Sequence, residues 1–161
     1  MTLHPFPPLY DRNSKILILG SFPSVRSREM LFFYGHPQNR FWRVLSAVLG
    51  EKVPVTVDEK RDLLLRRGIA LWDVIASCDI EGSADSSIRN AVPNDLTPIF
   101  DTADIRAVFV NGKTALRYYE KYQRPLLHRE AFCLPSTSPA NAAVNMENLV
   151  AKWRVIEPYL H

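Results

Sequence analysis

The sequence lacks several features that would place it in a special class of protein. Only two cysteines, Cys78 and Cys133, occur in 161 residues, and neither belongs to a CxxC pair or has a histidine at metal-binding spacing. We therefore expect two reduced, buried cysteines, with neither a disulfide nor a metal site. No apolar run of about 18 residues occurs, and the first residues lack the apolar segment of a signal peptide. These absences predict no membrane contact and a cytoplasmic protein, or a nuclear one if the host has a nucleus.

The sequence also lacks a strong charge excess, an internal repeat, a linker and a low-complexity tract. Its 20 basic and 17 acidic residues leave a net charge of +3, which permits a polyanionic partner without requiring one. The apolar share of 47% and the charged share of 23% are typical of an ordinary globular protein. The length predicts a single domain over residues 1–161.

Short apolar segments alternate with helical patterns along the chain. Strands are expected at 15–20, 69–75, 105–110 and 131–134. Helices are expected at 39–50, 56–65, 95–100, 113–122 and from 145 onward. An extended proline-rich arm is expected at 1–13 and a long loop at 78–95. This alternation predicts an α/β protein, a three-layer α/β/α sandwich around a central, mostly parallel four-stranded sheet.

The segment after the first expected strand has an unusual composition. Gly20 ends the strand, and Ser21-Phe22-Pro23-Ser24 follows before a run of aromatic, amide and arginine residues. Ligands of open α/β sheets bind just beyond the carboxyl ends of the strands. Aromatic faces, hydroxyls and arginines together suit a nucleic-acid base and its phosphates. We therefore expect the functional site in this segment.

Four segments carry a family resemblance, in this order along the chain: Gly20–Ser24 (GSFPS), Tyr34–Trp42 (YGHPQNRFW), Asp85–Asn90 (DSSIRN) and Leu134–Ala140 (LPSTSPA). Together they resemble the uracil-DNA glycosylase superfamily and, within it, the hypoxanthine-DNA glycosylase branch. The mismatch-specific thymine/uracil glycosylases share the Pro-x-Asn-Arg-Phe-Trp pattern. The resemblance spans residues 20–140, so it covers most of the chain.

The resemblance implies a monofunctional, monomeric enzyme that needs neither a metal nor a cofactor. Such an enzyme flips a deaminated base out of double-stranded or single-stranded DNA and hydrolyses its N-glycosidic bond. Hypoxanthine is the implied base, with uracil or xanthine as further candidates. The residues implied to bind the base are Ser21, Phe22 and Tyr34. Those implied to bind DNA are Pro23, Ser24, Arg89, Ser136, Thr137, Ser138 and Pro139, with Pro139 or Ala140 near the wedge that fills the vacated stack.

The sequence departs from its relatives at two places that bear on catalysis. Phe22 stands where relatives commonly carry an Asp or Asn that positions water. Ser136 or Thr137 stands where the best-known uracil enzymes carry a His that donates to the leaving base. In the hypoxanthine branch the Asn of the Pro-x-Asn-Arg-Phe-Trp pattern is the important catalytic residue, so the resemblance implies that Asn39 is catalytic. Its carbonyl could orient water, or its amide could bind the base.

The same residues could instead have purely structural roles. Asn39 could cap the helix that begins beside it, and Phe22 and Tyr34 could be core aromatics. Asp73 or Asp85 could assist as a carboxylate near the sugar. For the whole protein, the alternatives are a mismatch-type uracil/thymine glycosylase, a DNA-binding module that has lost the chemistry, and a hydrolase or transferase of free nucleosides.

Overall fold

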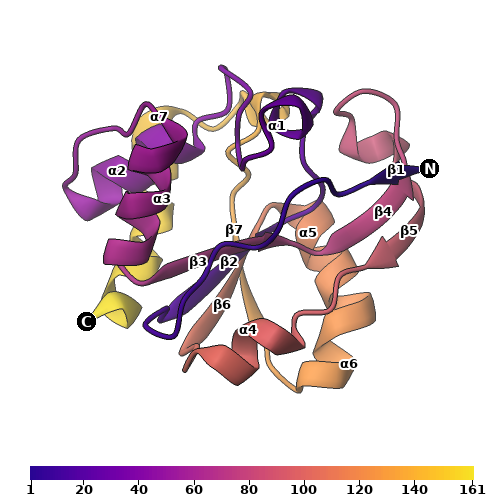
Figure 1. Ribbon diagram of the computed structural model, residues 1–161. Helices are drawn as coiled ribbons and strands as arrows, with labels where there is room; N and C mark the ends of the chain where they lie inside the picture. Colours follow the sequence, from indigo (N-terminus) through magenta and orange to yellow (C-terminus); the bar gives the residue numbers. More distant parts are fainter.

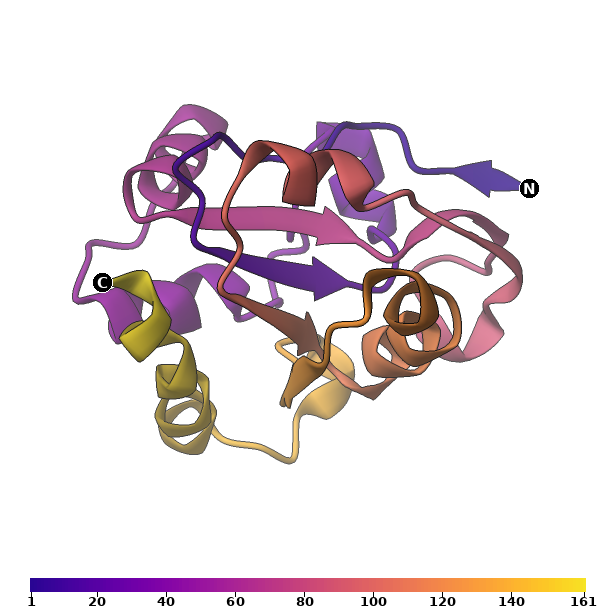
Figure 2. The same ribbon diagram turned by 90° about the horizontal axis from the view of Figure 1, so that it is seen from below.

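A four-stranded parallel sheet forms the centre of the computed structural model, which describes residues 1–161. The strands are β2 (Ile16–Gly20), β3 (Ile69–Asp73), β6 (Ala107–Asn111) and β7 (Ala131–Leu134). Their order across the sheet is β3-β2-β6-β7, and every neighbouring pair is parallel. Figure 2 shows β3, β2 and β6 as adjacent arrows that point the same way. The predicted fold class is therefore confirmed.

Helices cover both faces of this sheet. Figure 1 shows α2 (Phe41–Leu49), α3 (Val57–Arg66) and α7 (Met146–Trp153) on one side. On the other side lie α4 (Thr97–Thr102), α5 (Lys113–Tyr118) and α6 (Arg124–Leu127), with a π-helical turn at Tyr119–Gln123 between the last two. Short 3-10 turns occur at Asp85–Ser87, Pro139–Asn141 and Arg154–Leu160. The predicted three layers are thus present.

β2 is the most deeply buried element. The four side chains of Ile16–Leu19 have no exposed surface, because helices cover both faces of the strand. This burial explains why an unbroken apolar run, rather than alternation, marks the strand in the sequence. Each such side chain contributes about 1.5–3 kcal/mol of burial free energy, so β2 anchors the core.

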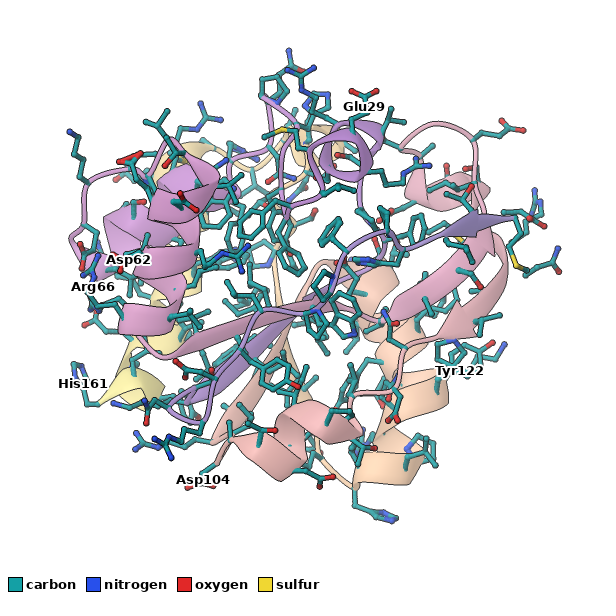
Figure 3. The ribbon with its side chains drawn as sticks, in the orientation of Figure 1. Glu29, Asp62, Arg66, Asp104, Tyr122 and His161 are labelled. Carbon is teal, nitrogen blue, oxygen red and sulfur yellow. The ribbon has the colours of Figure 1, made fainter.

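The local signals at the ends of α2 and α3 predicted them correctly. Gly50 ends α2 in the left-handed conformation, with φ of 68°. Thr56 and Glu59 form the capping box at the start of α3. On the exposed face of α3, Asp62 and Arg66 pair at 3.3 Å and project into solvent (Figure 3). The short helix α1 (Val25–Met30) was not predicted, because its polar sequence has no apolar period.

A second sheet corrects the predicted long loop at 78–95. β1 (Thr2–Leu3), β4 (Ile75–Asp79) and β5 (Arg89–Pro93) form an antiparallel sheet in the order β1-β4-β5. The expected strand at 69–75 is therefore two strands, β3 and the beginning of β4. β5 escaped prediction because it is an edge strand whose side chains are mostly exposed, so it shows no apolar alternation.

The two cysteines differ in environment, and one prediction was wrong. Both are free, and Cys78 is buried on β4 as expected. Cys133 is exposed, because β7 is the edge strand of the parallel sheet and part of one face is left uncovered. No helix of the structure has the length and apolarity that crossing a membrane requires.

Candidate active site

A groove opens where the parallel strands end. The last residues of the four strands are Gly20, Asp73, Asn111 and Leu134, and all four line the groove. From β2 the chain passes to β3, on one side of it, and later returns to form β6 on the other side. The order in which strands are added therefore reverses between β2 and β6. Ligands of open α/β sheets bind at such a switch point. The candidate site therefore lies where the sequence indicated.

Nearly all of the predicted site residues meet in this groove. Those that line it are Ser21, Phe22, Pro23, Ser24, Tyr34, Asn39, Ser136, Thr137, Ser138 and Pro139. Figure 1 shows α1 and the segment that leads to α7 at the same, upper edge of the molecule. Arg89 is the exception, since it is exposed on β5 and does not line the groove. The structure thus gathers segments that are far apart in sequence.

Tyr34 has an unusual backbone conformation that its neighbours hold in place. Its φ is 51°, in the left-handed region that residues other than glycine rarely adopt. The Trp42 indole donates a hydrogen bond to the Tyr34 carbonyl, and the following amide, of Gly35, donates to Ser27 Oγ at 2.8 Å. Phe41 stacks on one face of the Tyr34 ring at 4.0 Å. Such strain persists only where surrounding contacts enforce it, and it is common at functional sites.

The absence of a side chain at Gly20 lets two polar groups converge. A Cβ at Gly20 would lie 2.5 Å from Asp73 Oδ1 and 3.0 Å from the Tyr34 hydroxyl. The Tyr34 hydroxyl is buried and has no hydrogen-bond partner in the protein. Burial and the nearby Asp73 carboxylate raise the pKa of Tyr34 above its ordinary value, so the hydroxyl stays protonated. It is a donor available to a ligand.

Asp73 also pairs with a residue that no sequence motif singled out. His4, from the N-terminal arm, donates from Nε2 to Asp73 Oδ2 at 2.7 Å, and both side chains are buried. No local signal could have identified this pair, because 69 positions separate its members. The expected extended arm is partly a strand, β1, which brings His4 to Asp73 at the groove.

The two ends of the Asn39 side chain have different partners. Its Oδ1 accepts the backbone N–H of Phe41 at 2.9 Å, the first amide of α2. A backbone N–H can only donate, so the side-chain atom of Asn39 that it contacts must be the carbonyl oxygen and not the NH₂ group. The Nδ2 end has no partner in the protein, and Asn39 lines the groove. The N-cap residue of α2 is Arg40, so Asn39 is not the cap itself, but its oxygen binds the first amide of the helix from the position before the cap. The amide end remains free for a ligand.

Asp85 lies in the groove as a second carboxylate. Ser21 Oγ donates to both of its oxygens, at 2.9 and 3.0 Å. The pKa of Asp85 is raised above its ordinary value, mainly by burial and also by the nearby Asp73 carboxylate. The Ser21 hydrogen bond and the Arg117 charge lower it, but by less. Two carboxylates in different environments therefore face one groove.

Hydrogen bonds fix the loop after β7, residues 135–145. Thr137 is fully buried, donates its amide to Asn111 Oδ1 at 3.0 Å and accepts from Asn111 Nδ2 at 3.0 Å. The buried Trp153 donates its indole N–H to the Pro135 carbonyl at 2.9 Å. Thr137 therefore shapes the loop from inside, whereas Ser136 and Ser138 are only half-buried.

Arg40 connects this loop to the segment that carries Asn39. Its guanidinium donates to the carbonyls of Val144 at 2.6 Å and Asn141 at 3.0 Å. Its backbone N–H donates to the Thr137 carbonyl at 3.0 Å. Arg40 is thus a clamp between two walls of the groove and not a freely exposed charge.

Basic residues that sequence reasoning did not assign to the site also line the groove: Lys113, Arg117 and Lys152. They lie on α5 and α7, outside the four motif segments, and an isolated surface cation carries no local signal. No group of three or more His, Cys, Asp or Glu side chains is arranged to hold a metal ion.

The chain belongs to the uracil DNA glycosylase superfamily, whose family model matches residues 7–158. It is 36% identical over 141 residues to the hypoxanthine DNA glycosylase of Methanosarcina barkeri, covering 84% of this chain and 86% of that protein. It is 35% identical over 156 residues to the hypoxanthine DNA glycosylase of Methanosarcina acetivorans, covering 94% of this chain and 95% of that protein.

A solved structure supports the same assignment. The NMR structure of a candidate uracil DNA glycosylase from Methanosarcina acetivorans is 34% identical, has a TM-score of 0.78 and matches 94% of this chain and 96% of its own. Together these similarities support a DNA glycosylase, a hydrolase of N-glycosyl bonds whose substrate is DNA.

Removing the Arg40 clamp is expected to loosen the loop at 138–145. Arg40→Ala deletes two hydrogen bonds from a charged donor, each contributing about 1.5–3 kcal/mol. Amide hydrogen exchange in residues 138–145 should therefore accelerate about tenfold or more. Arg43→Ala, which removes an exposed arginine from α2, is the control and should leave exchange unchanged. Equal exchange in both variants would contradict the clamp.

Proposed function

We propose that this protein is a monofunctional DNA glycosylase that flips hypoxanthine out of DNA and hydrolyses its N-glycosidic bond, leaving an abasic site. Uracil and xanthine are secondary substrates of the same pocket. The observation that carries the proposal is the meeting of Tyr34, Asn39, Asp85 and the loop after β7 in one groove. The names of the Methanosarcina relatives support hypoxanthine as the base.

The aromatic groups suit a flipped base. Phe41 covers one face of the Tyr34 ring, and the Tyr34 side chain also borders the groove. Phe22 lines the groove while packing beneath the Arg28 guanidinium at 5.6 Å. A base removed from its stack recovers stacking energy on such faces, at about 1–3 kcal/mol for each contact. Ser21, Phe22 and Tyr34 are the proposed base-binding residues.

Asn39 is the proposed catalytic residue, and its role follows from its free end. Negative charge grows on the leaving purine as the glycosidic bond breaks, and a positioned donor stabilises that charge. Asn39 Nδ2 is such a donor, while Oδ1 stays on the helix. The amide therefore binds the base, and positioning of the water falls to another group.

Asp85 is the proposed carboxylate near the sugar. In its ionised form it can accept a proton from water and stabilise the positive charge that develops on the sugar ring. Ser21 holds both carboxylate oxygens, which fixes the direction of the group. Asp85 would then do the work of the carboxylate or amide that relatives carry where this chain has Phe22.

The phosphates of DNA would bind along the rim of the groove. The proposed contacts come from Pro23, Ser24, Ser136, Ser138 and Pro139, with the cations Lys113, Arg117 and Lys152 adding charge. Thr137 would act by shaping the loop, because its amide and hydroxyl already bond Asn111 and its carbonyl accepts from the Arg40 amide. One groove needs only one copy of the chain, so we propose a monomer.

Four matched duplexes test the proposed function. Each carries hypoxanthine, uracil, xanthine or normal adenine at the same position, and single-turnover excision is followed by alkali cleavage of the abasic product. Hypoxanthine should be removed fastest and adenine not at all. Strand breaks should appear only after alkali, since hydrolysis leaves the sugar in place. Intact strands on all four duplexes would favour a binding module instead, and excision of uracil alone would favour a uracil-type enzyme.

Two Asn39 variants separate catalysis from capping. Asn39→Asp keeps an acceptor for the Phe41 amide but loses the side-chain N–H, so the protein should stay as stable as wild type. Its excision rate should fall about 100-fold, the usual effect of losing one donor to a developing anion. Asn39→Ala should lose both stability and activity. A fully active Asn39→Asp variant would show that the residue serves only as a cap.

Asp85→Asn should reduce activity and raise stability. Burial raises the pKa of Asp85 in the folded protein above its value in the unfolded chain. The folded state therefore favours the protonated carboxyl, and the stability gained from this is present at acid pH and lost as the pH rises through the raised pKa. At neutral pH the ionised carboxylate opposes folding. The variant should therefore have the higher melting temperature at pH 7, with the difference vanishing below about pH 4. Wild-type excision should also fall as pH drops through the raised pKa. Unchanged excision in Asp85→Asn would remove Asp85 from the mechanism.

A further inference from the structure

The N-terminal arm holds His4 in a fixed position beside the groove. β1 pairs with β4, and the His4 amide donates to the Ala76 carbonyl at 2.9 Å. Further along the arm, Leu9 exchanges two backbone hydrogen bonds with Leu71 of β3, at 3.0 and 2.9 Å. The arm is therefore tied to both sheets, on either side of His4.

The His4 side chain completes a buried pair with Asp73. The side chains of His4 and Asp73 are only 2% and 6% exposed. The imidazole packs between two aromatic rings, with centroid distances of 4.4 Å to Phe6 and 4.3 Å to Trp72. Its Nε2 binds Asp73 Oδ2 at 2.7 Å. One carboxylate oxygen is thus occupied, and the orientation of the whole carboxylate is set.

The second oxygen of Asp73 has no donor within the protein. Oδ1 lies against Gly20, 2.5 Å from the position that a Cβ would take, and both residues line the groove. The buried Tyr34 hydroxyl, also without a partner, lies 3.0 Å from that same position. An acceptor and a donor therefore stand side by side in the groove, and neither has a partner.

The open Asp73 oxygen matches one group on the edge of a deaminated base, the ring N–H. Hypoxanthine and uracil each present a ring N–H beside a carbonyl, whereas adenine and cytosine present a ring nitrogen lone pair beside an amino group. A carboxylate oxygen accepts the ring N–H but repels a lone pair. Guanine and thymine carry the same N–H and carbonyl, so their exclusion depends on other contacts.

We propose that Asp73 is a specificity-determining residue that accepts the ring N–H of the flipped base, and that His4 is the residue that positions it. This inference rests on the proposed function and adds how the pocket separates a deaminated base from its amino parent. A carboxylate does not help the base to leave as an anion, so its effect falls on selective binding.

A binding experiment on uncleavable DNA isolates this effect. Two duplexes carry 2′-fluoro-2′-deoxyinosine or 2′-fluoro-2′-deoxyadenosine opposite thymine, because the electron-withdrawing fluorine suppresses glycosidic cleavage. The ratio of their dissociation constants, measured by fluorescence anisotropy, is the preference for hypoxanthine. Differences in base pairing within the DNA cancel when wild type and variant are compared on the same duplexes.

The expected result is a preference that depends on Asp73 and on a donor at position 4. Asp73→Asn turns an N–H toward the base and should reduce the preference about 10–100-fold, the range for a buried hydrogen bond to a charged group. His4→Phe fills the same space without a donor and should reduce the preference about fivefold or more. His4→Gln keeps a donor to Asp73 and should retain the preference for hypoxanthine. Leu3→Ala, at a neighbouring side chain that is 67% exposed, is the control and should behave as wild type.

Two results would overturn the inference: no preference in the wild type, or an unchanged preference in Asp73→Asn that melts like wild type. If Asp73→Asn does not fold, equal preferences in the Phe and Gln variants of His4 overturn it. Excision of hypoxanthine, uracil and xanthine from ordinary duplexes by the wild type is measured beside these. If the wild type excises hypoxanthine but the variants keep the wild-type binding preference for it, only this inference is rejected. If the wild type excises none of the damaged bases, the proposed function is rejected.

Discussion

The parallel pairing of β2 with β3 and β6 is the constraint on which the site depends. Its register sets Gly20 opposite Asp73 and Leu19 opposite Val110, so the strands end at one edge. The groups that follow them must then share one groove. Gly20 is essential to this arrangement, because any side chain there would collide with Asp73 and crowd Tyr34.

Side chains from distant segments then hold the loops around that edge in place. Asn111 forms two hydrogen bonds with Thr137, and the Arg40 guanidinium donates to the carbonyls of Asn141 and Val144. These bonds form before any substrate arrives, so the ordering of the loops costs nothing at the moment of binding. Preorganisation of this kind is what a site for charge stabilisation requires.

Two aspartates in the groove have different environments, and the different roles proposed for them rest on that difference. Asp73 has a histidine on one oxygen and aromatic rings around that histidine. Asp85 has a single serine hydroxyl shared between its two oxygens, and burial raises its pKa. The same side chain can therefore serve recognition at one position and chemistry at another.

The sequence by itself determined the four parallel strands, the ends of α2 and α3, and the motif residues that line the groove. Those features are marked by local patterns, such as the buried run of Ile16–Leu19 and the capping box at Thr56. Only the tertiary structure revealed β5, the half-exposed edge at Cys133, and the pairs His4–Asp73 and Ser21–Asp85. Each of these depends on which segments become neighbours after folding. A side chain's partner 69 positions away leaves no periodicity or cap in the sequence, so only the folded chain could decide it.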